Sequence, residues 1–161
     1  MQFKKTPIHI LRLIHYPPQL AYALGLGPII GRLILLLTTR GRKTGLARVT
    51  PLQYEIVEGV VYVASARGEN ADWVRNIQAN PKVSVRLRKL EFQAEAEVIT
   101  CVEKITDFLE LRLQRHPIMI RTMFQAEGLS FPMQRNRLEE YASYLALVAI
   151  RPTPIGSVCL S

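Results

Sequence analysis

Three apolar segments joined by short turns are the feature that most constrains the fold. They cover residues 33–39, 46–57 and 60–65. The second segment alternates apolar side chains at Leu52, Tyr54 and Ile56, which is the period of a half-buried strand. Glycine occurs in both connections, in Gly41 and in the pair Glu58-Gly59. Turns this short join neighbouring antiparallel strands, so the pattern predicts a three-stranded meander.

The rest of the chain adds strands and helices in an irregular order. Further strands are predicted over residues 82–87, 90–100 and 145–150, and helices over 72–79, 102–124 and 133–144. Asn70 or Asp72 is expected to cap the first helix, and Pro117 to break the second. Helices inserted among hairpin-joined strands predict an α+β fold with an antiparallel sheet. At 161 residues, one domain spanning 1–161 is expected.

The amino-terminal third is apolar and basic. Residues 8–16 predict a short amphipathic helix, and residues 20–37 are almost as long as a membrane span. Glycines, Pro28 and Arg32 interrupt that stretch, and an arginine at the centre of a span costs about 2.5–3.5 kcal/mol. We therefore expect residues 1–33 to form a helical segment that packs on the body. No secretory signal is recognised, so a cytoplasmic location is expected, with peripheral membrane contact through Lys4 and Lys5 left open.

All of the net charge of +8 comes from the first third of the chain. Residues 1–48 contain eight basic residues and no acid, and four of the eight lie in residues 40–48. A concentrated cationic turn predicts a site for an anionic ligand, with Thr44 and Thr50 as hydroxyl donors and main-chain N–H groups facing the ligand. The turn is not a Walker loop, which needs GxxxxGK[ST]. A solvated hairpin turn is the alternative.

Other candidate residues have ordinary structural explanations. The small residues of the sequence Ala64-Ser65-Ala66-Arg67 could let a flat ring approach the backbone, or could simply connect a strand to a helix. Trp73 could form a pocket wall or pack a helix on the sheet.

The histidines lack metal-ligand spacing, so no metal is expected. No catalytic constellation is recognisable, so catalysis would depend on a bound cofactor.

Three stretches in this order resemble a known family. Over about residues 35–85 the chain is similar to the deazaflavin-dependent nitroreductase family. The similar stretches are LLLTTRGRKTGLARVTPLQY, VVYVASARG and ADWVRNIQANPKVSV. The resemblance implies an antiparallel split β-barrel, related to the FMN-binding split barrels, that binds coenzyme F420.

The resemblance also implies roles for individual positions. It places the cofactor's phosphate and glutamate tail on Arg42, Lys43, Thr44 and Arg48. The deazaflavin ring would lie along Val49, Thr50, Pro51, Leu52 and Gln53, with Ala64, Ser65, Ala66 and Arg67 at its other edge. The end of the site would be closed by Asp72, Trp73, Val74, Arg75 and Asn76. It identifies no catalytic proton donor.

The function implied is hydride transfer from reduced F420 to a small-molecule acceptor: a quinone, a nitroaromatic compound or an activated alkene. Two alternatives remain, an FMN-binding oxidoreductase on the same barrel and a non-catalytic cofactor carrier or peripheral membrane protein. A homodimer is compatible with the sequence. Nucleic acid is not expected as a partner, because no exposed aromatics are interleaved with the basic cluster.

Overall fold

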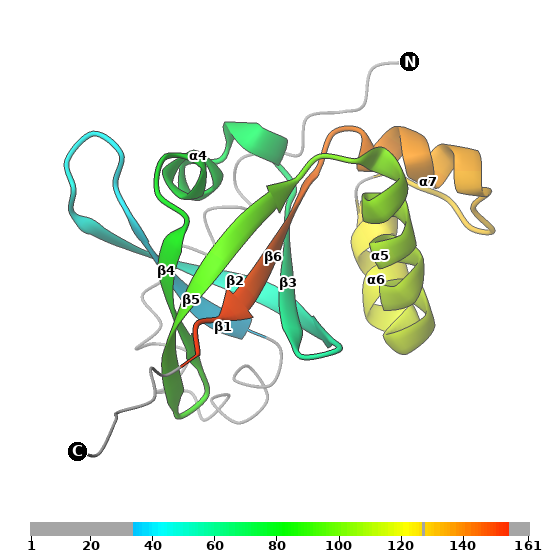
Figure 1. Cartoon of the computed structure of the whole chain (residues 1–161). Helices are drawn as coiled ribbons and strands as arrows, with labels where there is room; N and C mark the ends of the chain where they lie inside the picture. Colours follow the sequence, from blue (N-terminus) through cyan, green and yellow to red (C-terminus); the bar gives the residue numbers. More distant parts are fainter. Residues whose placement is uncertain (1–33, 127, 155–161) are drawn as a thin grey trace, which may run out of the picture.

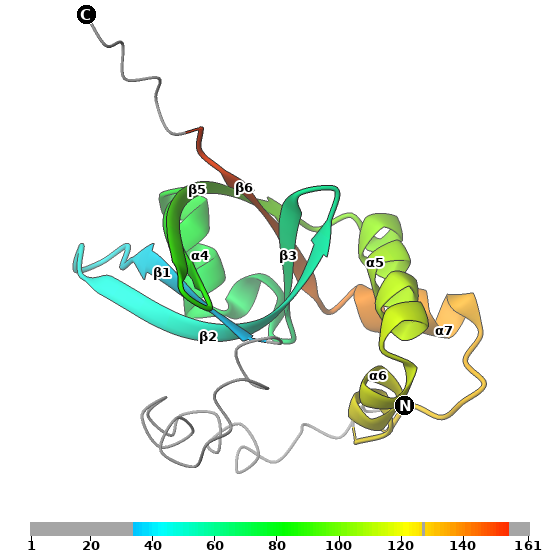
Figure 2. The ribbon, with the colours of Figure 1, turned by 90° about the horizontal axis from the view of Figure 1, so that it is seen from below.

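The computed structural model describes residues 34–126 and 128–154. Six antiparallel strands form a closed barrel in the order β1-β2-β3-β6-β5-β4, and Figure 2 shows the barrel as a ring. The strands are β1 (Ile34–Arg40), β2 (Ala47–Val57), β3 (Val60–Ser65), β4 (Lys82–Leu87), β5 (Leu90–Ile99) and β6 (Ala146–Pro152). Strand β1 closes the barrel because it pairs with β2 on one edge and with β4 on the other.

Alternation along the strands builds the barrel interior. Leu35 and Leu37 on β1 are fully buried, and Leu52 lies directly opposite Leu35 on β2. The inward set is completed by Val61, Val63, Ile77, Val83, Val85, Ala94, Ala96, Val148 and Ile150. Full burial of one aliphatic side chain contributes about 1.5–3 kcal/mol, so this set is a major source of stability.

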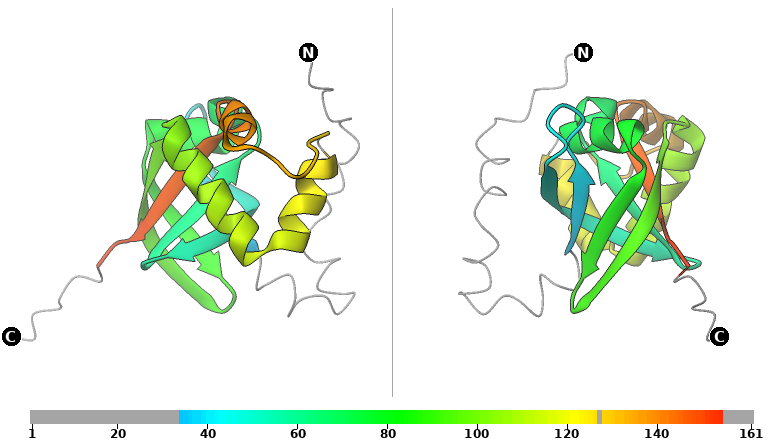
Figure 3. Two further views of the ribbon diagram at one scale, coloured as in Figure 1. Left: turned by 90° about the vertical axis from the view of Figure 1, so that its right-hand side faces the viewer. Right: turned by 60° about the vertical axis from the view of Figure 1, so that its left-hand side comes forward.

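A second apolar cluster lies outside the barrel, under α5 (Val102–Arg115), α6 (Pro117–Ala126) and α7 (Arg135–Ala142). Its buried members are Ile105, Phe108, Leu109, Ile120, Phe124, Leu138, Ala142, Leu145 and Leu147. Helix α5 contacts both α6 and α7 (Figures 1 and 3). Strand β6 is buried on both faces because Val148 enters the barrel while Leu147 joins the helical cluster.

The helical group is joined to β2 by a buried polar cluster. Glu55 is only 8% exposed, and its carboxylate accepts a 2.7 Å hydrogen bond from Arg115 and lies 3.1 Å from His116 Nε2. Arg112, also buried, donates to Gln53 Oε1 at 3.1 Å. Burial lowers the pKa of Arg112, and the charge of Glu55 opposes that shift. These side chains therefore fix the end of α5 on the outer face of the sheet.

The short helices η2 (Gly68–Asn70) and α4 (Asp72–Ala79) follow β3 and lie at one end of the barrel, beside the β1–β2 turn (Figures 1 and 3). Helix α4 contacts β1 and β5, and the half-buried Trp73 packs against the barrel core. In the described residues, no helix is both long enough and apolar enough to cross a membrane. The same residues contain no group of three or more His, Cys, Asp or Glu that could hold a metal ion.

Most of the expected elements are confirmed. The antiparallel hairpin at Glu58-Gly59, the helix carrying Trp73 and the break at Pro117 are all present. The helix expected over 133–144 is shorter, because it begins at Arg135 and ends at Ala142. The amino-terminal helix and the packing of residues 1–33 lie outside the described residues, and the single-domain organisation remains a prediction.

The expected cap of α4 is wrong. The residue at the cap position is Ala71, and no side chain caps the helix. Asn70 instead accepts a 2.7 Å hydrogen bond from Arg75, and Asp72 is the first helical residue. The partner of Asp72 is Arg42, 30 positions away, which local sequence could not reveal, whereas the partner of Asn70 lies on α4 itself.

The Glu55 cluster gives a stability prediction. Glu55→Gln removes the charge that lies beside Arg115 and acts on Arg112, so we expect the free energy of unfolding to fall by about 1–3 kcal/mol. Urea denaturation measures the change. The matched control is Glu95→Gln, on the exposed face of β5, which should alter stability by less than about 0.5 kcal/mol. Equal effects of the two substitutions would contradict the role assigned to Glu55.

Candidate functional site

The basic turn, residues 40–48, is a closed hairpin connection between β1 and β2. The Gly41 N–H donates to the Leu46 carbonyl at 2.8 Å, and the Gly45 N–H donates to the Gly41 carbonyl at 2.7 Å. A Cβ at Gly41 would lie 3.0 Å from Thr44 Oγ1, and Gly45 has a φ of +69°. Glycine is therefore favoured at Gly41 by the close approach of its neighbours and at Gly45 by its left-handed backbone.

These internal bonds change one expectation about the turn. The N–H groups of Gly41, Arg42, Gly45 and Leu46 all donate to acceptors within the protein. The sequence had suggested that main-chain N–H groups of the turn would face a ligand. An anionic ligand at this turn would therefore be bound mainly by side chains.

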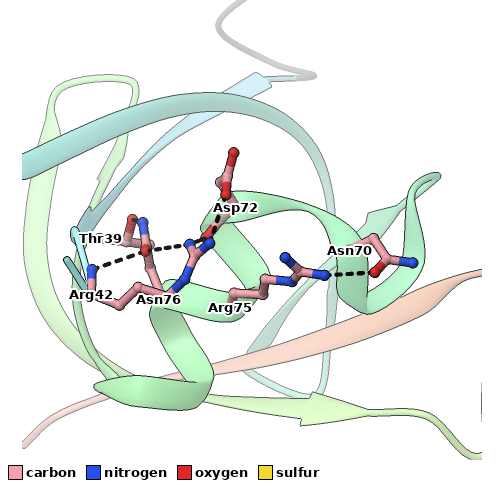
Figure 4. A network of polar contacts seen from close by, with 6 residues as sticks. All are labelled: Thr39, Arg42, Asn70, Asp72, Arg75 and Asn76. Atoms are coloured by element: carbon pink, nitrogen blue, oxygen red, sulfur yellow. Dashed lines mark hydrogen bonds and ion pairs between the residues drawn. The ribbon is translucent and has the colours of Figure 1, made fainter.

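Helix α4 holds the turn from the side, through the contacts drawn in Figure 4. The guanidinium of Arg42 donates to the Asp72 carboxylate at 3.0 Å and to Asn76 Oδ1 at 3.2 Å. Asn76 Nδ2 in turn donates to the hydroxyl of Thr39 at 3.2 Å. The hydrogen bond from Arg42 is the main cause of a lowered pKa at Asp72, with the charge of Arg42 next. Asp72 is therefore ionised at neutral pH.

The other cations of the basic turn are available to a ligand. Arg40, Lys43 and Arg48 are exposed, and none of them forms an ion pair or side-chain hydrogen bond within the part of the chain that the structure describes. Thr39 and Arg48 are opposite each other in the β1–β2 register, so they share one face of the hairpin. Cations without counter-ions at a turn are suited to an anionic ligand.

In the described part of the chain, the first part of strand β2, next to the basic turn, is paired on one edge only. Ala47–Gln53 of β2 pairs with β1, whereas only Tyr54–Val57 pairs with β3. Within the described residues, the β3-side edge of β2 over residues 47–53 therefore has no strand partner. An unpaired strand edge presents N–H and C=O groups, which a planar polar ring can hydrogen-bond.

The side chains of residues 48–53 lie on alternating faces of β2. The register places Arg48, Thr50 and Leu52 on the face shared with the inward residues of β1. Val49 and Gln53 lie on the other face, where Val49 is 59% exposed and Gln53 contacts α5. A ligand can therefore meet the backbone of this whole segment but the side chains of only one face.

The remaining predicted site residues lie after β3 and on α4. Ser65 is buried and donates to the Gly68 carbonyl at 2.9 Å, which orders the loop before α4. The burial of the others varies: Ala66, Arg67, Asp72 and Arg75 are exposed, Ala64 and Trp73 are half-buried, and Val74 and Asn76 are buried. Val74 has a packing role in this arrangement, because its side chain is fully buried.

The structure also adds residues that sequence reasoning missed. Thr39, only 1% exposed, is the buried hydroxyl that receives the Asn76 amide. Every second residue of β1 points into the barrel, as Leu35 and Leu37 do, and Thr39 is the next in that series. The alternation of the strand could therefore have placed Thr39 inward.

Two hollows of the described surface lie away from the basic turn. One, of about 360 Å³, is lined by Glu69, Ile77, Gln78, Pro81, Ala96, Val98 and Thr100. Another, of about 550 Å³, lies at the β5–β6 end and is lined by Glu95, Ala96, Glu97, Arg151, Pro152, Thr153 and Pro154. Neither includes a residue of the basic turn, and both contain glutamates, which disfavour an anionic ligand. We therefore assign the candidate site from the charges and the open strand edge.

Comparison with known protein families shows which family this chain belongs to. Residues 24–118, more than half of the chain, match the model of the F420H(2)-dependent quinone reductase family. The chain belongs to that family, and it is an F420-dependent oxidoreductase. Its family membership gives coenzyme F420 as the cofactor.

Solved structures with the same fold include members of related groups. The conserved hypothetical protein Rv2991 from Mycobacterium tuberculosis aligns at a TM-score of 0.57 with 14% identity, covering 80% of this chain and 79% of that one. An F420-H2 dependent reductase, FDR-A, aligns at 0.50 with 21% identity, covering 74% and 95%. A putative pyridoxamine 5'-phosphate oxidase from Listeria innocua aligns at 0.52 with 12% identity, covering 81% and 90%. At these identities the likeness concerns the split-barrel fold.

Proposed function

We propose that this F420-dependent oxidoreductase passes a hydride to a quinone, and that it binds the cofactor between the basic turn, the open edge of β2 and the start of α4. The observation that carries the site proposal is the group of exposed cations at the turn that have no counter-ion among the described residues. The family description supports a quinone as acceptor. Nitroaromatic compounds and activated alkenes are the competing acceptor classes.

The residues of the site fit the chemical parts of the cofactor. Its tail carries phosphate and glutamate carboxylates, which Lys43 and Arg48 are placed to bind through charge-assisted hydrogen bonds. Its planar ring suits the unpaired edge of β2 beside Thr50 and Leu52. When bound, the reduced cofactor supplies a hydride from ring carbon C5.

The chain's own residues bind and orient in this proposal. Half-buried Leu52 and Trp73 pack against the barrel core, so they form a rigid apolar support that also excludes water. Exposed Val49 and Leu46, each 59% exposed, provide apolar surface beside the cations. Holding the ring and acceptor in fixed relative positions is the contribution expected of such a scaffold.

The partners follow from the same reasoning. One structure of similar fold, with 19% identity and a TM-score of 0.50, is described as a domain-swapped dimer. For this chain a homodimer is a prediction that sedimentation can test. The expectations about peripheral membrane contact and cytoplasmic location involve residues 1–33 and also remain predictions.

The cation assignment predicts the effect of a double substitution. Lys43→Ala with Arg48→Ala should weaken F420 binding by about 1–3 kcal/mol, because two charge-assisted contacts are lost while solvent screens exposed charges. Fluorescence titration of the cofactor at low salt measures the dissociation constant. Arg88→Ala with Lys89→Ala removes the same charge at the β4–β5 turn and should leave binding nearly unchanged. Equal losses in both double variants would refute the assignment.

The acceptor proposal predicts a ranking of substrates. With reduced F420 in excess, kcat/KM for a soluble benzoquinone should exceed that for a nitroaromatic compound of similar size by at least about tenfold, or roughly 1.4 kcal/mol in transition-state binding. Oxidation of the cofactor, followed by absorbance, gives both rates. A preference for the nitroaromatic compound would contradict the quinone proposal, and turnover with reduced FMN alone would contradict the cofactor.

A further inference from the structure

Arg42 differs from the other cations of the basic turn. Its side chain is 25% exposed, and it donates to the Asp72 carboxylate, to the Asp72 carbonyl at 3.4 Å and to Asn76 Oδ1. Lys43 and Arg48 have no such bonds within the described residues and are exposed. The donors of Arg42 are therefore directed at α4, where Asp72 and Asn76 accept them (Figure 4).

Asn76 holds both the backbone and the side chain of the turn. Its Oδ1 accepts the main-chain N–H of Arg42 at 3.1 Å as well as the guanidinium, and its Nδ2 reaches Thr39. Asn76 is 4% exposed and Thr39 is 1% exposed, so the bond between them is buried, and the two bonds from Arg42 to Asn76 are partly buried. Breaking them would leave buried polar groups unpaired, which makes this arrangement costly to rearrange.

We propose that Arg42 is a positioning residue and not a ligand of the cofactor tail. Arg42, Asp72, Asn76 and Thr39, hereafter the α4 lock, fix the basic turn on α4 so that Lys43 and Arg48 face the anionic tail. This inference rests on the proposed function, in which Lys43 and Arg48 bind that tail. A turn held in place before binding loses less conformational freedom when the ligand arrives.

Asp72 provides an independent reason for this assignment. Its carboxylate is 78% exposed and ionised, and it stands at the start of α4, which the proposed site includes. A negative charge in that position repels the cofactor tail, so by itself it weakens binding. Its contribution to the site is the contact with Arg42, which orients the turn.

The two roles for Arg42 predict opposite results for Asp72→Asn. If Arg42 were a ligand held back by Asp72, the substitution would release it and tighten F420 binding. In the α4 lock the substitution loosens the turn, so the dissociation constant should rise by about threefold to tenfold although a repelling charge has been removed. Asp72 is exposed, so the variant should fold, and thermal unfolding confirms this. A dissociation constant that falls or stays unchanged overturns the proposal.

Arg42→Lys and Arg42→Gln separate charge from geometry. Lysine keeps the charge but cannot donate to Asp72 and Asn76 as a fork, so in the α4 lock both variants bind F420 equally weakly. A ligand role predicts that Arg42→Lys binds like the parent, and that result overturns the proposal. Arg88→Lys at the β4–β5 turn makes the same exchange outside the proposed site; it is the matched control and should bind like the parent.

The salt dependence of binding gives a second readout, which a loss of structure alone would not produce. Lys43→Gln removes a cation that faces the tail, so added NaCl should weaken its binding less steeply than that of the parent. Arg42→Gln should keep the parent's salt dependence while its dissociation constant rises. A flattened dependence in Arg42→Gln overturns the α4 lock. Unchanged binding after Lys43→Ala with Arg48→Ala would instead refute the proposed function itself.

Discussion

Pairing of β1 with both β2 and β4 is the constraint on which the rest of the structure depends. It closes the barrel, buries Leu35 and Leu37, and brings the end of β1 to the same end of the barrel as α4. Because β1 continues directly into the basic turn, barrel closure also determines where the cations lie. The site is thus carried by rigid elements of the fold, with only a six-residue connection between β1 and β2.

The stagger of β2 against its neighbours creates the other half of the proposed site. Its first part pairs with β1 and its last part with β3, so residues 47–53 keep one open edge. On the last part, Glu55 and Gln53 receive side chains from α5, which attaches the helical group to the barrel. A single strand thereby connects the proposed cofactor site, the barrel core and the helical group.

The strands could be predicted because their signals are local. Alternation and turn glycines placed β2, β3 and the hairpin between them within about one residue of the structure. The partners of Arg42 and Glu55 could not be predicted, because each bond joins residues 30 to 61 positions apart. The family resemblance named Asp72 and Asn76 as site residues, but only the structure shows that they contact the turn.

The central claim is that the cofactor binds at the basic turn and the open edge of β2. Titration of ¹⁵N-labelled protein with oxidised F420, followed by amide chemical shifts, tests it most directly. The account predicts the largest shifts at residues 43–50, 52–53 and 66–73, with small shifts at residues 95–97 and 151–153. Shifts concentrated in the β5–β6 hollow, with the basic turn unaffected, would contradict it.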